Sequence, residues 1–203
     1  MTVNAEDDVL DLLPAREGHF LLESGHHGDR WLDLESLCYD VAAVRAASRR
    51  LVRQLYAYDI EAVCGPLVEG AFVGLMVAEL LAQPFTYSVP RRRPRKGELY
   101  PMKYAVPGEL RAKLKDRRVA VINDVIGAGS AVRGTLDDLR ACGARPSVIG
   151  TLVVAGAAAD RLAAEYKVPL ETLARTPVNI WAPDDCPLCA KKVAVVDAGA
   201  EGA

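Results

Sequence analysis

The sequence lacks a long apolar run and an excess of charge of either sign. No uninterrupted apolar segment approaches the roughly 20 residues of a membrane-spanning helix, so we expect no such helix. A formal net charge of −2 over 203 residues gives no support to a general binder of nucleic acid or of anionic membranes. With 51% hydrophobic and 26% charged residues, the composition predicts one globular domain with a full core.

A basic N-terminal region, a disulfide framework and internal repeats are also missing. The chain begins with acidic residues, unlike the basic start of a secretory signal. Its five cysteines are scattered and odd in number, which favours reduced thiols over a disulfide scaffold. We therefore expect a cytoplasmic protein.

The segment at 119–135 has the pattern of a strand, a tight loop and a helix. Residues 119–122 are apolar and mostly β-branched, as in a strand buried on both faces of a parallel sheet. Asn123 and Asp124 follow, at the strand end where open α/β sheets bind their ligands. Gly127 and Gly129 then let main-chain N–H groups approach a ligand, and the following helix directs its positive end at the loop. These features predict an anion site.

Two missing residues exclude common nucleotide motifs from this segment. A dinucleotide fingerprint needs a third glycine where the chain has Val132, and a P-loop needs a lysine that the loop does not contain. A plain structural turn stays open as the alternative.

The same strand, loop and helix pattern occurs earlier in the chain. Residues 60–64 read as a strand, 65–70 as a loop and 71–82 as an apolar helix. Further apolar runs at 85–89 and 147–155 indicate strands, and 157–166 indicates a helix. Repeated β-α units predict an α/β fold with a central, mostly parallel sheet flanked by helices.

The segment at 119–135 resembles the phosphoribosyl-diphosphate (PRPP) signature of type I phosphoribosyltransferases. The resemblance implies that Asn123 and Asp124 hold the ribose hydroxyls, with Asn123 standing where the family has an acidic residue. It also implies that the 5′-phosphate is bound by a loop consisting of Gly127, Ala128, Gly129, Ser130 and Ala131.

The N-terminal part resembles the hood of orotate phosphoribosyltransferases, which covers the base. The phrase Phe20-Leu-Leu-Glu-Ser-Gly carries the likeness, although Glu23 stands where that family has a lysine. Trp31 and Leu32 fall where the family contacts the base, and packing in the core is an equally open interpretation of Trp31. The resemblance divides the single domain, 1–203, into a hood at 1–40, a core at 41–170 and a C-terminal tail at 171–203.

Two further segments match the family's pyrophosphate-binding parts. The loop at 65–70 resembles the pyrophosphate loop, with Glu69 where orotate enzymes have a lysine. Five of the six residues at 91–96 are basic and resemble the catalytic flexible loop, while a solvated charge run is the alternative. The implied pyrophosphate-binding residues are Gly65, Pro66, Leu67, Val68, Glu69, Gly70, Arg91 and Arg95, and the implied catalytic residues are Asn123, Asp124, Arg92, Arg93 and Lys96.

The implied reaction is transfer of a 5-phosphoribosyl group from PRPP to a nucleobase nitrogen, with release of pyrophosphate, as in pyrimidine synthesis. The resemblance implies Mg²⁺ bound mainly through PRPP, and a homodimer whose basic loops reach the neighbouring sites. A PRPP-binding regulator with the same fold and little activity is the alternative that Asn123 and Glu69 motivate.

The tail carries one C-x-x-C motif, Cys186 and Cys189. Structural zinc needs four ligands, so a zinc site would require other cysteines, a histidine or a partner chain. We expect reduced thiols in a turn and no metal held by protein ligands. His26 and His27 are expected to be solvated turn residues.

Overall fold

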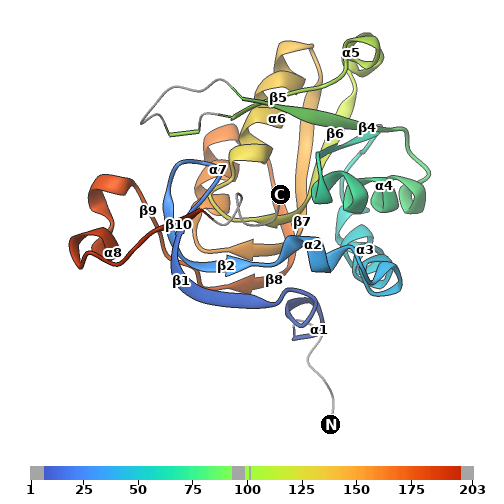
Figure 1. Cartoon of the computed structure of the whole chain (residues 1–203). Coiled ribbons are helices and arrows are strands. Elements are labelled where there is room, and N and C mark those ends of the chain that lie inside the picture. Colours follow the sequence, from blue (N-terminus) through green and yellow to red (C-terminus); the bar gives the residue numbers. More distant parts are fainter. Residues whose placement is uncertain (1–6, 93–98, 101, 198–203) are drawn as a thin grey trace.

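The main sheet of the chain is mostly parallel. The computed structural model describes residues 7–92, 99–100 and 102–197. Six strands lie in the order β5-β4-β3-β6-β7-β8, parallel except for the antiparallel pair β4 and β5. This confirms the predicted fold class (Figure 1). The strands are β3 (Ala62–Pro66), β4 (Phe85–Arg92), β5 (Met102–Ala105), β6 (Arg118–Ile126), β7 (Arg145–Ala155) and β8 (Leu170–Thr176).

Helices cover both faces of this sheet because its central strands are apolar on both faces. In β6, Ala120 and Ile122 belong to one core cluster, whereas Val119 and Val121 belong to the other. The first cluster also contains residues of α1 (Asp7–Leu10), α2 (Leu34–Leu37), α3 (Val41–Leu55) and α4 (Glu69–Leu81). The second contains residues of α5 (Gly108–Leu114), α6 (Ser130–Ala141) and α7 (Ala158–Tyr166).

Local sequence signals set several helix ends. The Asp40 carboxylate accepts a hydrogen bond from the Ala43 N–H at 3.0 Å, so Asp40 is the N-cap of α3. Gly143 follows the end of α6 with a φ of +80°, a conformation that glycine adopts without a Cβ penalty.

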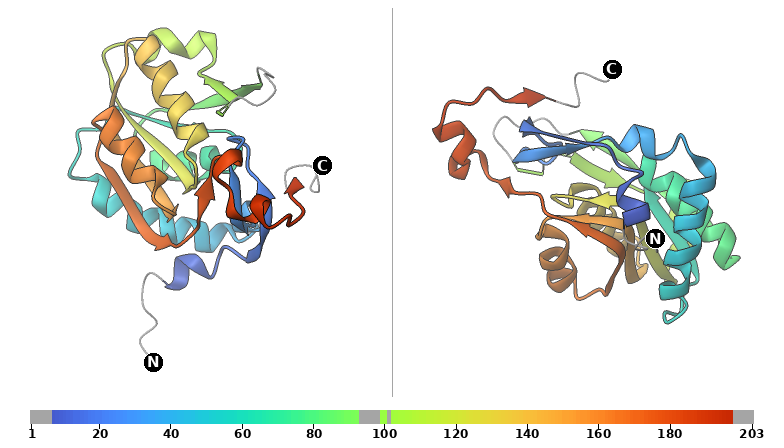
Figure 2. Two further views of the ribbon diagram at one scale, coloured as in Figure 1. Left: turned by 90° about the vertical axis from the view of Figure 1, so that its left-hand side faces the viewer. Right: turned by 90° about the horizontal axis from the view of Figure 1, so that it is seen from below.

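A second, smaller sheet joins the two ends of the chain. Strands β1 (Ala15–Leu21) and β2 (His27–Leu32) form a hairpin, and the strand order is β10-β1-β2-β9. The tail contributes β9 (Ile180–Trp181), the 3-10 helix η1 (Pro183–Asp185), α8 (Pro187–Ala190) and β10 (Val196–Asp197). The tail extends away from the main sheet and lies beside the hairpin (Figure 2).

Three predicted boundaries are wrong. Strand β6 does not end at Ile122 but continues through Asn123 and Asp124. Strand β3 includes Gly65 and Pro66, and α4 begins at Glu69, so the predicted loop at 65–70 shrinks to two residues. Strand β4 continues through Arg92, because pairing with β5 extends it into the basic segment.

Within the described ranges, no helix is both long and apolar enough to cross a membrane.

Gly65 is required where β3 packs against α4. A Cβ at this position would lie 2.6 Å from the Gly70 carbonyl oxygen and 2.7 Å from the Ala71 Cα, both backbone atoms that cannot move aside. We expect Gly65→Ala to lower the free energy of unfolding by about 1–3 kcal/mol.

The measurement is urea unfolding, with Gly108→Ala as the matched control. Nothing lies within 4 Å of a Cβ at Gly108, in the first turn of α5. Equal stability of the two variants would contradict the close packing of β3 on α4.

Candidate functional site

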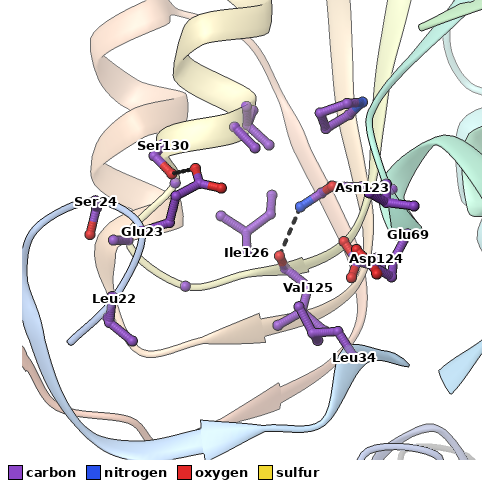
Figure 3. A pocket seen from close by; sticks show the side chains of 18 of the residues that line it. Leu22, Glu23, Ser24, Leu34, Glu69, Asn123, Asp124, Val125, Ile126 and Ser130 are labelled. Carbon is purple, nitrogen blue, oxygen red and sulfur yellow. Dashed lines mark hydrogen bonds between the residues drawn. The ribbon is translucent and has the colours of Figure 1, made fainter. Parts of the chain in front are cut away.

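A cavity of about 270 Å³ lies where the carboxyl ends of β3 and β6 meet the hairpin. Five parts of the chain line it: the hairpin at 22–24 with Trp31, Leu34 of α2, the β3–α4 turn at 66–70, the segment at 123–132, and Tyr104 of β5. Figure 3 shows Glu23, Ser130, Asn123, Asp124 and Glu69 around this space. The cavity thus brings together the predicted ribose, phosphate and pyrophosphate segments.

The loop at 127–131 ends at the N-terminus of α6. Gly129 is the N-cap residue, with a φ of +83°, and it makes no side-chain capping bond. No side chain of the cap therefore covers the first-turn N–H groups, which together with the helix dipole favour an anion. Ala128, Ser130 and Ala131 also line the cavity.

Glu23 reaches this loop from the tip of the hairpin. Its carboxylate accepts a hydrogen bond from the Ser130 hydroxyl at 2.8 Å (Figure 3). It also accepts from the Tyr104 hydroxyl, with both oxygens at 3.1 Å. Burial and the neighbouring Glu23 raise the pKa of Tyr104, which keeps the phenol protonated. The Glu23 carboxylate therefore accepts the hydrogen bond of the Ser130 hydroxyl, a donor that the loop could otherwise offer to an anion.

The Asp124 carboxylate is buried, and one of its oxygens lacks a hydrogen bond. The residue is only 3% exposed, and its Oδ2 atom has no hydrogen-bond partner among the described residues. Burial, and next the charge of Glu69, raise the pKa of Asp124 to about 7. Asp124 and Glu69 both line the cavity, and Figure 3 labels them at the same edge of it. This arrangement can accept a hydrogen bond from a ligand hydroxyl or attract a cation.

Asn123 ties the two strand-to-helix turns together. Its Nδ2 donates to the Val125 carbonyl oxygen at 2.8 Å. Its Oδ1 lies against Gly70, where a Cβ would approach that oxygen to 2.0 Å. Asn123 is 7% exposed and still lines the cavity, so it positions the turns as well as facing the ligand space.

The β3–α4 turn is short and opens toward the cavity. The Leu67 N–H donates to the Ser88 carbonyl oxygen at 2.9 Å, which anchors the turn on β4. The peptide bond between Leu67 and Val68 is cis. Pro66, Leu67, Val68, Glu69 and Gly70 all line the cavity, whereas Gly65 is covered by the backbone of α4.

The two candidate base-contacting residues take different positions. Trp31 lines the cavity, with its ring centroid 6.2 Å from that of Phe20. Leu32 packs against the hydrophobic core.

The basic segment is described only in part. Arg91 is exposed on β4 and does not line the cavity. The side chain of Arg92 lies outside the described residues, as do Arg93, Arg95 and Lys96. Tyr100 follows this segment: its N–H donates to the Ser24 carbonyl oxygen at 2.8 Å, and its hydroxyl to that of Ala128 at 3.4 Å. The chain leaving the basic segment therefore contacts both the hairpin and the loop at 127–131.

Sequence reasoning missed the contributions of Glu23, Tyr100 and Tyr104. The hydrogen bond between Tyr104 and Glu23 joins residues 81 positions apart, and that between Ser130 and Glu23 joins residues 107 apart. No local pattern could reveal these contacts.

The sequence is similar to orotate phosphoribosyltransferases along most of its length. It is 28% identical to the enzyme of Thermotoga maritima over 188 residues, which are 92% of each chain. It is 26% identical to that of Caldanaerobacter subterraneus, covering 96% of this chain and 97% of the other. No protein-family model matches the sequence.

Solved structures agree on the fold. Orotate phosphoribosyltransferase from Aeropyrum pernix matches with a TM-score of 0.59 and 27% identity, covering 79% of this chain and 87% of that one. Adenine phosphoribosyltransferase from Trypanosoma brucei matches with a TM-score of 0.67 and 16% identity, covering 84% and 79% respectively.

The raised pKa of Asp124 predicts a pH-dependent stability. Burial moves this pKa from 3.8 to about 7, so between these values the folded chain holds a proton that the unfolded chain releases. The contribution of Asp124 is therefore most favourable below pH 4 and is lost as the pH rises to 7. Because Asp124→Asn does not ionise, we expect its stability relative to the parent to rise between pH 5 and pH 8 by on the order of 2 kcal/mol.

Urea unfolding of both proteins at the two pH values, without Mg²⁺ or PRPP, measures this difference. A stability difference that is the same at pH 5 and pH 8 would show that Asp124 ionises normally in the folded chain.

Proposed function

We propose that this chain, which has the type I phosphoribosyltransferase fold and a sequence similar to orotate phosphoribosyltransferases, transfers a 5-phosphoribosyl group from PRPP to a nucleobase nitrogen. Pyrophosphate is the other product, and orotate is the proposed base. The observation that carries the proposal is the cavity itself, which places an open helix N-terminus beside a buried carboxylate at the carboxyl edge of a parallel sheet.

The chemistry asks mainly for positioning and charge stabilisation. Displacement at the anomeric carbon develops positive charge on the sugar, which nearby carboxylates stabilise. The loop at 127–131 binds the 5′-phosphate through its amides and the Ser130 hydroxyl. Asp124, with its unpartnered Oδ2, and Asn123 hold the ribose hydroxyls. The turn at 66–70 approaches the pyrophosphate.

The site fits Mg²⁺ as the partner of PRPP. Asp124 and Glu69 place two carboxylates at one side of the cavity, and the orphaned Oδ2 of Asp124 is an oxygen ligand of the kind that Mg²⁺ prefers. Held by these residues together with the diphosphate of PRPP, the ion would offset the negative charge of the leaving group. It would also relieve the repulsion between Glu69 and the polyanionic substrate.

The basic segment closes the site in this proposal. Arg91, Arg92, Arg93, Arg95 and Lys96 neutralise the pyrophosphate and exclude water during the reaction. Support comes from the described residues at either side: β4 and β5 form the stem, and Tyr100 contacts the hairpin and the phosphate loop.

A cytoplasmic homodimer is part of the proposal. Val68, Phe72 and Leu75 share one face of α4 and its preceding turn and are 53%, 47% and 53% exposed. A second copy that covers this apolar face would bring its basic segment toward the neighbouring cavity. The five free thiols fit a reducing compartment.

The relatives described above are all named as transferases, which does not favour a PRPP-binding regulator without activity. Trp31 is the proposed stacking partner of the base, since it lines the cavity from the hairpin.

A pyrophosphate-release assay tests the proposal. With PRPP and Mg²⁺, we expect release in the presence of orotate and little with uracil or adenine. Asp124→Asn should lower kcat/KM by about 100-fold, because a buried group aimed at the reacting sugar is lost.

Asp116→Asn is the control for this substitution. Asp116 pairs with Arg145 at the surface and has a φ of +62°, which asparagine tolerates. No pyrophosphate release with any of the three bases would reject the transferase function.

The Glu23 carboxylate is expected to weaken the binding of PRPP to the parent protein. Its carboxylate occupies the Ser130 hydroxyl and repels the incoming phosphate. We expect Glu23→Gln to lower the KM for PRPP by roughly fivefold at low salt, because it removes the repulsion between one carboxylate and the phosphate. The effect should be smaller at high salt, which screens this repulsion.

Glu17→Gln, on the same hairpin but exposed and paired with Arg30, should leave this KM unchanged. A higher KM in Glu23→Gln would mean that Glu23 organises the loop rather than competing with phosphate.

A further inference from the structure

Four side chains from opposite ends of the sequence converge beside the hairpin. His19 lies on β1 and His27 begins β2, while Cys186 and Cys189 come from the tail at α8. Their nitrogen and sulfur atoms all lie within 4.8 Å of one another. The expectation that His27 is a solvated turn residue is therefore wrong, because its ring packs edge-on against His19 with centroids 4.8 Å apart.

The separations are close to those of a tetrahedral metal site: two of the four lie within its range and two are slightly shorter. The His19 Nε2 and His27 Nδ1 atoms are 2.9 Å apart, and the Cys189 sulfur lies 3.2 Å from His27 Nδ1. From His19 Nε2, the Cys186 and Cys189 sulfurs lie at 3.4 and 3.7 Å. Zinc bonded to nitrogen at about 2.0–2.1 Å and to sulfur at about 2.3 Å separates its tetrahedral ligands by roughly 3.3–3.8 Å.

The His19 ring is oriented as a metal ligand. Its Nδ1 is 2.8 Å from the Val193 carbonyl oxygen, an acceptor, so Nδ1 carries the proton. Nε2, which faces the cluster, then presents a lone pair. A carbonyl that fixes the tautomer in this way is the usual outer partner of a metal-bound histidine. His19 is only 2% exposed and Cys186 only 3%, so two of the ligands are shielded from water.

The tail has almost no apolar core to hold it in place. Between residues 175 and 197, Cys186 is the only buried residue. Strands β9 and β10 have two residues each, and neither η1 nor α8 buries an apolar side chain. So short a segment needs another source of stability, and a structural metal supplies one.

We propose that His19, His27, Cys186 and Cys189 bind one structural Zn²⁺ ion, which fastens the tail to the hairpin. The histidines flank the hairpin tip at 22–26 in the sequence, and this tip carries Glu23 into the cavity. The ion thereby fixes the tip end of the hairpin that covers the ligand site. The ligand set is closed, with four protein donors, so the role is structural.

Metal analysis of tag-free protein from zinc-supplemented cells tests this site. We expect one zinc per chain, and less than a tenth of that in the Cys186→Ser/Cys189→Ser double variant and in His19→Gln. Cys142→Ser and His26→Asn are the matched controls, since Cys142 lies at the end of α6 and the His26 ring contacts Ser24 and Tyr100; both should keep the full zinc content.

Cobalt binding to the parent protein tests the site without a substitution, so the result does not depend on whether the variants fold. Co²⁺ should give the intense d–d bands of a tetrahedral site and thiolate charge-transfer bands in the near ultraviolet. Chelation should increase hydrogen exchange at 19–27 and 180–197 without affecting β6 and β7. Parent protein that is purified without zinc, binds no cobalt and contains either free thiols or a Cys186–Cys189 disulfide by intact mass would overturn the proposal.

Discussion

The contact of Gly70 with the Asn123 side chain fixes how closely the two strand-to-helix turns approach each other. Strands β3 and β6 are neighbours, so the turns that follow them face one cavity. The absence of a Cβ at Gly65 and Gly70 lets α4 lie against β3 and leaves room for Asn123. A side chain at either position would separate the turns and widen the site.

This closeness has an electrostatic consequence. It places Glu69, in the first turn of α4, near the buried Asp124, and the charge of Glu69 opposes the ionisation of Asp124. The cavity is thus suited to a ligand that brings hydroxyl donors and a cation. The free N-terminus of α6 lies at the other side of the same cavity and favours an anion. One substrate with a phosphate, a diol and a metal-bound diphosphate satisfies all three demands.

Much of the site could be predicted from local sequence, and the rest depends on long-range contacts. Val119 to Ile122 mark β6, and the polar pair and the two glycines mark the segment at 123–129 that lines the cavity, because burial and backbone conformation act over a few residues. The ends of β6 and β4 were misplaced because pairing with β7 and with β5 extends strands past polar or basic residues.

The missed features all join distant segments. Glu23 reaches Ser130 across the hairpin, and a lone C-x-x-C motif could not indicate that β1 and β2 supply two histidines beside it. These residues converge because the small sheet pairs the N-terminal hairpin with strands of the tail. The local sequence of neither segment indicates this pairing.

The central claim is that main-chain amides at 127–131 bind a sugar phosphate. The most direct measurement is a titration of ¹⁵N-labelled protein with ribose 5-phosphate, followed by amide resonances. We predict saturable changes in amide chemical shift for Gly127, Ala128, Gly129, Ser130 and Ala131. These changes should be larger than those of the amides of α7. Saturable binding that leaves these five amides unchanged, or no binding at all, would contradict the account.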